Sequence, residues 1–499
     1  MRSNIVFAVL VVTLGAFVGV LFVRHRVPAQ GGAPVRAASA SASASAPASV
    51  AARGSASAAP HAPAESASAT PSLGRPLRVV ALGWDLAAAG LVANHGLAAG
   101  DKQSRFGKAG LDVALSVVDS PEDVERALAR GGADKAGADV ALLPLPRFVA
   151  SFEHLKALDP EMFLVTGWSS GREMLESRYH SLAQLPAKGG VKLGAAPGSS
   201  AAFLGLFALD MSGVGTSRVQ LVSPSVADAD LVAVEWGRDE RDAGTARMLF
   251  GTGDALHLVP FVAVAQRSMI EKHRAELVLW SRIWLAATKD VAADASGAAR
   301  RVAAEKGAPE PLALLTRLGQ GSRETLAGNA EQLGLSGRGA VTLDSLFQLT
   351  WRLWRGVQLL GTPAPEQAPL DGDVVAALVR SAKPSELQEQ ERPASPAAPA
   401  VDAGAKHASP AAPPLVYRQP GTKPDVDALL PTAGLLAGVF PRSPIQLTLY
   451  RGVLPDKKAT KAAVDRIAER YGIASDRLSA GHLRHAPRST AAVAVLPAE

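Results

Sequence analysis

The sequence predicts an α/β protein that consists of a two-lobe body, an N-terminal membrane anchor and a small C-terminal α/β module. In the body, strand-like apolar runs alternate with helix-like stretches, as is typical of parallel sheets with helical crossovers. The alternation restarts near residue 163, so we expect two lobes. The anchor is predicted by residues 5–23, a charge-free apolar run of nearly the length that spans a bilayer.

The flanks of the apolar run favour an uncleaved anchor over residues 1–26. A basic triplet follows the run at 24–26, where a cleavable signal would carry small residues. The alternative is cleavage at Val27-Pro28-Ala29. The charged flanks alone would keep the body in the cytoplasm, whereas the spacer that follows favours an exported body.

Two Ala/Ser/Pro-rich segments, residues 27–75 and 383–414, divide the rest of the chain. They contain almost no large apolar residue, so we expect them to be linkers. They delimit a two-lobe domain at 76–382 and a module at 415–499. We place the second lobe at about 166–262.

Composition excludes several classes of function. The chain has no cysteine, which removes disulfides, cysteine-ligated zinc and thiol nucleophiles. Its net charge of +6 includes no dense basic block, so we expect no nucleic-acid partner. The ten histidines show no metal-ligand spacing, and no catalytic motif stands out. We therefore expect a protein that is not an enzyme and uses no cofactor or metal.

The first lobe is predicted to begin with alternating strands and helices. Ser120 is an expected N-cap, because Pro121 and two acidic residues follow it. The expected strands are 78–82, 112–118 and 139–143, and the expected helices are 86–95 and one that starts at residue 121.

The second lobe and the helical return are predicted from the same pattern. The expected strands are 163–166, 191–195, 230–234 and 255–259. The expected helices are 181–185, 201–211 and 245–250, followed by 276–289, 298–306, 311–318 and 343–360. In the C-terminal module we expect strands at 415–417, 445–450 and 491–496 and helices at 426–439 and 457–471.

Two strand ends carry a Gly-Trp pair followed by a polar turn, at Gly83-Trp84-Asp85 and at residues 167–171. Ligands of open α/β sheets bind beyond the carboxyl ends of the strands. We therefore expect Trp84 and Trp168 to form two walls of one cleft. Alternatively, each tryptophan is a core residue beneath a loop.

A helix start at Ser199 and Ser200 adds an anion-binding element, because free N–H groups at a helix N-terminus attract negative charge. The alternative is a plain N-cap pair. Trp84, Trp168 and Trp236 follow or end strands, where they would shield the organic part of a ligand.

Residues 76–381 resemble the solute-binding proteins of ABC importers, in the nitrate/sulfonate/taurine branch. The order and spacing of several pieces carry the resemblance: Gly83-Trp84, Gly110-Leu111-Asp112-Val113, Asp119-Ser120, Gly137-Ala138-Asp139-Val140, Trp168-Ser169-Ser170-Gly171, Gly253-Asp254-Ala255 and Pro260-Phe261. The resemblance implies a periplasmic-binding-protein-like fold that closes on a small solute, either an oxyanion, a sulfonate-like or an amino-acid-like molecule. It also implies an ABC permease as partner.

The same resemblance implies a set of ligand-binding residues at the cleft. These are Trp84, Asp85, Asp119, Ser120, Pro144, Trp168, Ser169, Ser170, Gly171, Ser199, Ser200 and Trp236. The chain departs from the family at Arg172-Glu173, where many relatives carry Ala-Asp. Arg147 and Arg172 are the candidate cations for an anionic ligand.

Residues 472–481 resemble the late part of an OmpA-like domain, which binds peptidoglycan. The Asp and Arg of that family are not identifiable in this chain, so a generic α/β module is the alternative. We thus expect an inner-membrane anchored protein with a periplasmic body that binds a solute for import. The rival hypothesis is a cell-envelope scaffold or sensor that keeps the fold without transport. The fold implied by the resemblance also occurs in pyrimidine-forming and tetrapyrrole-forming enzymes, which depend on a cysteine that this chain lacks.

Overall fold

The computed structural model describes residues 73–497 except 186–188, 225–228, 236–246, 338, 390–414 and 487. The predicted anchor and nearly all of the first linker lie outside the described residues. Within the described part, no helix has the length and apolar character needed to cross a membrane.

The first lobe is built on a six-stranded sheet in the order β11-β4-β10-β3-β1-β2. Its strands are β1 (Leu77–Leu82), β2 (Val113–Val118), β3 (Val140–Pro144), β4 (Pro160–Ser169), β10 (Pro260–Gln266) and β11 (Gly321–Arg323). Strand β1 pairs parallel to β2 and β3, and β10 pairs antiparallel to β3 and β4. The pairing of β1, β2 and β3 confirms the expected parallel α/β unit. The other part of the sheet is antiparallel, because the chain returns from the second lobe through β10.

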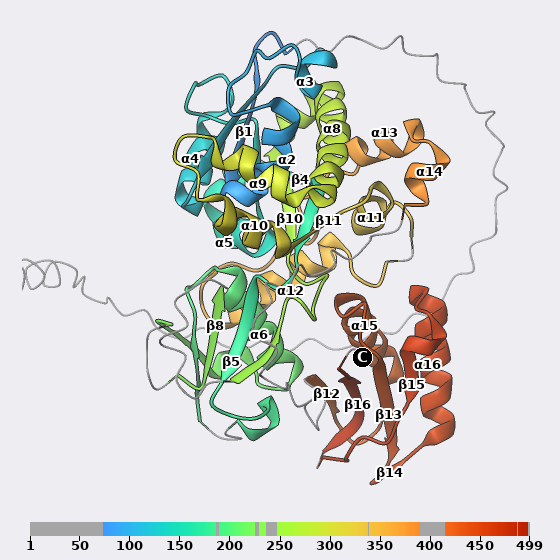
Figure 1. Cartoon of the computed structure of the whole chain (residues 1–499). Helices are drawn as coiled ribbons and strands as arrows, with labels where there is room; N and C mark the ends of the chain where they lie inside the picture. Colours follow the sequence, from blue (N-terminus) through green and yellow to red (C-terminus); the bar gives the residue numbers. More distant parts are fainter. Residues whose placement is uncertain are drawn as a thin grey trace, which may run out of the picture. The chain divides into compact units, whose positions relative to one another are not determined.

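Helices cover both faces of this sheet (Figure 1). Each parallel strand leads into a helix: β1 into α2 (Trp84–Asn94), β2 into α4 (Pro121–Arg130) and β3 into α5 (Leu145–Leu155). On the α2 face pack α8 (Arg274–Ala293) and α9 (Ala295–Ala303). The packing is close, since a Cβ on Gly90 would lie 2.4 Å from the ring of Trp284.

The remaining first-lobe helices come from the return of the chain or from short connections. They are α3 (Arg105–Lys108), α7 (Arg267–Lys272), α10 (Pro311–Gly319), α11 (Leu326–Gln332), α12 (Leu343–Gly356), α13 (Asp373–Ser381) and α14 (Pro384–Leu387). Helix α14 falls at the start of the segment that the sequence predicts as the second linker.

The second lobe has a five-stranded sheet in the order β7-β6-β8-β5-β9. Its strands are β5 (Glu173–Ser177), β6 (Val191–Gly194), β7 (Val219–Val222), β8 (Leu231–Glu235) and β9 (Arg247–Gly251). Helix α6 (Ser200–Met211) packs on β5 and β8 and is buried along almost its whole length. This sheet lies within the range that the sequence predicts for the second lobe.

The chain passes between the two sheets from β4 to β5 and from β9 to β10, and here the structure corrects three sequence predictions. Strand β4 continues to Ser169, so Gly167 and Trp168 lie inside a strand instead of in a turn after it. Residues 247–251 form strand β9 instead of the end of a helix, because they pair with β5 at the sheet edge. The strand expected at 255–259 begins instead at Pro260, which pairs opposite Trp168. Proline is tolerated at the first position of a strand, although it has no N–H to donate to the neighbouring strand.

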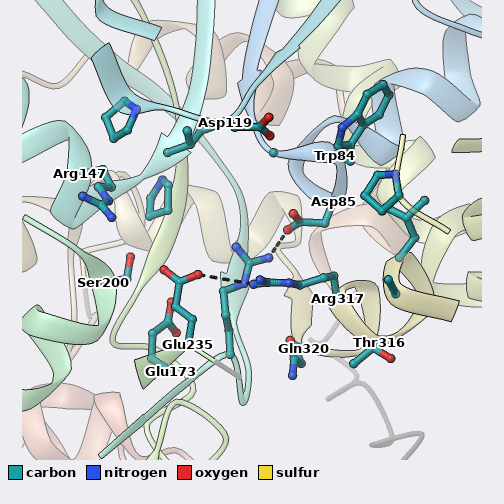
Figure 2. A pocket seen from close by; sticks show the side chains of 18 residues that line it. Trp84, Asp85, Asp119, Arg147, Glu173, Ser200, Glu235, Thr316, Arg317 and Gln320 are labelled. Atoms are coloured by element: carbon teal, nitrogen blue, oxygen red, sulfur yellow. Dashed lines mark hydrogen bonds and ion pairs between the residues drawn. The ribbon is translucent and has the colours of Figure 1, made fainter. Parts of the chain in front are cut away.

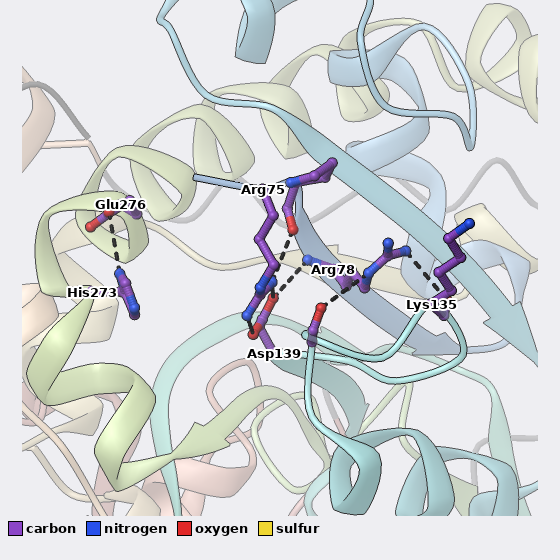
Figure 3. A network of polar contacts seen from close by, with 8 residues as sticks. Arg75, Arg78, Lys135, Asp139, His273 and Glu276 are labelled. Atoms are coloured by element: carbon purple, nitrogen blue, oxygen red, sulfur yellow. Dashed lines mark hydrogen bonds and ion pairs between the residues drawn. The ribbon is translucent and has the colours of Figure 1, made fainter. Parts of the chain in front are cut away.

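A polar network fixes the sheet end that lies opposite the carboxyl ends of the parallel strands (Figure 3). Arg75 donates two hydrogen bonds to Asp139, at 2.6 and 2.7 Å, and the backbone N–H of Arg78 donates a third. The Arg78 guanidinium donates to the carbonyls of Gly132 and Lys135. These bonds attach the first described residues to the start of β3.

The C-terminal module has the predicted order of strand, helix, strand, helix and strand, with two short strands added. It comprises β12 (Leu415–Pro420), α15 (Val426–Val439), β13 (Ile445–Arg451), β14 (Leu454–Pro455), α16 (Lys457–Tyr471), β15 (Leu478–Ala480) and β16 (Ser489–Val495). Strand β16 pairs antiparallel with both β12 and β13. Its OmpA-like resemblance stays a prediction.

Candidate functional site

A cavity of about 650 Å³ lies where the carboxyl ends of the first-lobe strands face the second lobe (Figure 2). Its size falls within the range of small-molecule sites, about 300–1,000 Å³. The first lobe contributes the ends of β1, β2 and β3 and helix α10. The second lobe contributes the starts of β5 and α6 and the end of β8.

Gly83 forms the sharp turn that brings Trp84 and Asp85 to the cavity. Its φ of 97° lies in the region that favours glycine. Its N–H donates to the carbonyl of Val118, which ties this turn to the end of β2. Helix α2 therefore begins at the cavity wall, with Trp84 half-buried and Asp85 in its first turn.

The ion pair between Asp85 and Arg172 joins the first lobe to the connection into β5. Both side chains are largely buried, at 15% and 8% exposure. Arg172 also lies over the ring of Phe261, 5.1 Å from its centre. Burial by itself would lower the pKa of the Arg172 guanidinium. The negative charges of Asp85 and Glu173 outweigh the effect of burial, so the pKa is raised.

Glu173 lies beneath this pair and is fully buried. One carboxylate oxygen accepts hydrogen bonds from Ser169 and Thr252, while the other has no hydrogen-bond partner among the residues that the structure describes. Burial raises the pKa of Glu173, although the charge of Arg172 and the bond from Ser169 act against the rise. Arg172 is thus flanked by two carboxylates that belong to the protein.

A second ion pair crosses the cavity, from Arg317 of α10 to Glu235 at the end of β8, at 3.5 Å. Both side chains are about 40% exposed, so water reaches this pair. Exposed pairs of this kind contribute roughly 0–1 kcal/mol.

Arg147 is the third arginine on the cavity wall, in the first turn of α5. Among the described residues it makes no hydrogen bond or ion pair. Burial lowers its pKa, and the more distant charges of Glu235 and Glu122 oppose that effect. A Cβ on Gly198 would lie 3.8 Å from its guanidinium, so Arg147 lies against the loop that opens α6. In Figure 2, Arg147 and Ser200 lie on the side of the cavity away from Trp84 and Asp85.

The structure brings five of the predicted ligand residues to the cavity wall: Trp84, Asp85, Asp119, Pro144 and Ser200. Ser120 instead caps α4, accepting from the N–H of Asp123, and Ser199 caps α6. Trp236 lies outside the described residues. Ligand binding by all of these residues stays a prediction.

Residues 168–171 do not form the second cavity wall that the sequence predicts. Trp168 is fully buried in β4, and its indole donates to Glu324 at 2.7 Å. Ser169 is also buried, and the N–H groups of Ser170 and Gly171 donate to Gln320 and Thr252. The physical reason is the longer β4, which carries the Gly-Trp pair into the core.

Sequence reasoning missed the wall contributed by α10. Thr316, Arg317 and Gln320 line the cavity, and the buried side-chain oxygen of Gln320 has no hydrogen-bond partner in the described part of the chain. The sequence predicts this helix correctly, but no local signal shows that a return helix reaches the first strand ends. Within the described part of the chain, no cluster of acidic or histidine side chains is suited to a metal ion.

Comparison with known proteins gives fold likenesses. No family model matches the chain, and no curated protein matches it. Similar solved structures include the periplasmic aliphatic sulphonate-binding protein SsuA from Escherichia coli, at 16% identity and a TM-score of 0.39 over 58% of this chain and 92% of that one. The alkanesulfonate-binding protein SsuA from Xanthomonas axonopodis pv. citri, bound to MOPS, shares 19% identity at a TM-score of 0.39, over 57% and 94%.

The periplasmic nitrate-binding protein NrtA from Synechocystis is similar at 12% identity and a TM-score of 0.40, over 62% of this chain and 86% of its own. Likenesses at this level carry no argument about what this chain binds.

Proposed function

We propose that the two-lobe body binds a small solute in the cavity between its lobes, outside the cytoplasm, and delivers it to an ABC permease. The observation that carries the proposal is the cavity of about 650 Å³ at the carboxyl ends of β1, β2 and β3. It combines one aromatic wall, Trp84, with charged groups from both lobes. Such a mixture of apolar surface and a few polar groups is typical of small-molecule sites.

The experiment is a ligand screen on the full chain by thermal unfolding, with nitrate, ethanesulfonate, sulfate and amino acids. A solute that binds only the folded state raises the melting temperature, by an amount that grows with the logarithm of its concentration above Kd. We expect a hit whose shift disappears in Trp84→Ala. The matched control is Met248→Ala, which removes an apolar side chain that is 56% exposed on β9, outside the cavity. The absence of a shift with every solute would refute the proposal.

A second candidate is a cell-envelope scaffold or sensor that has lost transport. The two ion pairs across the cavity favour it, since Arg172 and Arg317 are paired with the protein's own carboxylates. The screen separates the two, because a scaffold predicts no thermal shift. Peptidoglycan binding by the C-terminal module, and attachment to the membrane through residues 1–26, remain proposals of the same kind.

A further inference from the structure

One edge of the C-terminal module carries an exposed apolar hairpin tip among basic side chains. Across its sheet, Gln419 of β12 pairs with Ala491 of β16, and Ala491 pairs with Leu449 of β13. The end of β12, the start of β16 and the end of β13 therefore share this edge. The hairpin of β13 and β14 and the start of α16 lie there too (Figure 1), since the N–H of Asp456 donates to the carbonyl of Leu449.

The tip of this hairpin exposes two adjacent aliphatic side chains. Val453 is 71% exposed and Leu454 is 70% exposed, and both follow Gly452, which turns the chain at a φ of 67°. The residue after such a glycine in a two-residue turn is usually polar. An apolar side chain stabilises a protein when it is removed from water, so the fold of the module does not account for this pair.

Basic side chains surround the tip. The connection between β15 and β16 reaches this edge, because the Tyr450 hydroxyl donates to the carbonyl of Leu483 at 2.8 Å and Arg418 donates to the carbonyl of Arg484 at 3.0 Å. The exposed basic residues at this edge are Lys423, Arg451, Lys457, Lys458, Arg484 and Arg488. Within the described ranges, none of these six side chains forms an ion pair; the ion pairs of the module are formed by other basic residues, both on α16.

The carboxylates at this edge are engaged elsewhere. Asp425 and Asp456 cap α15 and α16, each accepting from a backbone N–H three residues further on, and Asp427 is paired with an arginine of α16. Lys457 and Lys458 lie in the first turn of α16, which contains no acidic residue. The helix dipole disfavours positive charge in a first turn, so the stability of α16 does not account for these two lysines.

From the apolar tip and the basic side chains around it, we propose that this edge of the C-terminal module docks on the surface of an anionic lipid bilayer. Val453 and Leu454 enter the boundary between headgroups and acyl chains, while the basic side chains contact lipid phosphates. A soluble polyanion or a glycan polymer could engage the charges but offers no apolar phase to the tip. This docking is separate from solute binding in the two-lobe body.

The test makes use of the absence of cysteine from the chain, because a single introduced thiol can be labelled without background. Val453→Cys in the full chain carries an environment-sensitive nitrobenzoxadiazole group. Ser475→Cys carries the same group as the control, since it is exposed and lies just before β15, which pairs with the start of β13 at the opposite edge.

The labelled chains are mixed with vesicles of phosphatidylcholine that contain increasing amounts of phosphatidylglycerol. We expect the emission of the label at residue 453 to shift to the blue as phosphatidylglycerol increases. The shift should be reversed in about 1 M KCl, where the screening length is about 3 Å. The label at residue 475 should not respond, so attachment through residues 1–26 alone gives no signal.

A charge variant tests the basic contribution, at the lipid composition where half of the chain labelled at residue 453 is docked. Lys457→Gln with Lys458→Gln should lower the ratio of docked to undocked chain about 25-fold, at about fivefold for each basic residue. The matched control is Lys102→Gln with Lys108→Gln, which are exposed in the first lobe and should leave the ratio unchanged.

An apolar variant tests insertion of the tip under the same conditions. Leu454→Asn should lower the ratio of docked to undocked chain about tenfold or more, because burial of its side chain among the acyl chains is lost. The matched control is Leu312→Asn, whose leucine is 75% exposed on α10. Equal melting temperatures show that the variants are folded.

The inference is overturned if the label at residue 453 keeps its emission on phosphatidylglycerol vesicles, or if either the lysine variant or Leu454→Asn docks as well as its control. A response to isolated peptidoglycan with none to vesicles also overturns it, and assigns this edge to that polymer. Each of these outcomes leaves the proposed function to its own ligand screen.

Discussion

The buried pair of Asp85 and Arg172 should be a large local determinant of stability. The variant Asp85→Asn keeps the size of the side chain and removes its charge. Only 8% of the Arg172 side chain is exposed, so little water can replace the lost carboxylate. The guanidinium would then retain the charge of Glu173, the weaker effect of Glu235 and the face of Phe261.

The expected cost follows from this geometry. Removing one partner of a buried ion pair costs about 3–5 kcal/mol, because an uncompensated charge stays inside the protein. Glu173 supplies a second carboxylate, so we expect the low end, about 3 kcal/mol. The double variant Asp85→Leu with Arg172→Met replaces both partners with apolar residues. It should cost no more than about 1 kcal/mol, because neither charge of the pair is then left uncompensated inside the protein.

Urea unfolding of the full chain, followed by far-ultraviolet circular dichroism, measures these differences from the shift in midpoint at constant slope. The control is Asp465→Asn, which removes an exposed i,i+4 pair with Lys461 and should change stability by at most about 0.5 kcal/mol. The reasoning is refuted if Asp85→Asn costs less than about 1 kcal/mol or if the double variant is as unstable as the two single variants summed.

Three further predictions concern stability. Asp139→Ala leaves Arg75 and the N–H of Arg78 without their carboxylate and should cost about 3 kcal/mol in urea unfolding; a loss below 1 kcal/mol contradicts it. Ser120→Ala removes the cap of α4 and should lower the free energy of unfolding by about 1 kcal/mol. Ser120→Thr keeps a capping hydroxyl, so it should retain most of the stability if the cap is the cause. Burial raises the pKa of Glu173 above its ordinary value of 4.5. The folded state therefore binds the proton more tightly than the unfolded state does, and the free energy of unfolding falls as pH rises from the ordinary pKa through the raised one. Glu173→Gln lacks this loss, and its stability relative to the natural chain should increase between pH 4 and 8; a constant difference contradicts the assignment.

The sequence predicts those parts of the fold that short-range signals determine. Residues 77–82 form β1 as predicted, and the N-cap at Ser120 is observed because its side chain accepts from an N–H three residues away. Helix α16 runs from Lys457 to Tyr471 and ends at Gly472 in a left-handed conformation, as the glycine indicates. Each signal lies within one turn or one strand of the residue it affects.

The errors arise where pairing across long distances decides the structure. Residues 247–251 become a strand because β5 offers them an edge, and nothing in their own sequence shows that edge. The same applies to Trp168, whose place in the core depends on β10 and β11 on either side of β4. The cavity lies at the end of β1, where the Gly-Trp pair at 83–84 predicts it, but not at the second Gly-Trp pair, and its α10 wall is more than 200 residues away in the chain from β1.

The two ion pairs in the cavity differ in a way that bears on how the site works. Asp85–Arg172 is buried, so salt screens it little, and it fixes the connection into β5 against the start of α2. Glu235–Arg317 is longer and about 40% exposed, so it contributes little and is easily separated. Because Glu235 belongs to the second lobe and Arg317 to the first-lobe helix α10, this pair is a weak contact between the lobes, and Glu235→Gln should change the free energy of unfolding by no more than about 1 kcal/mol.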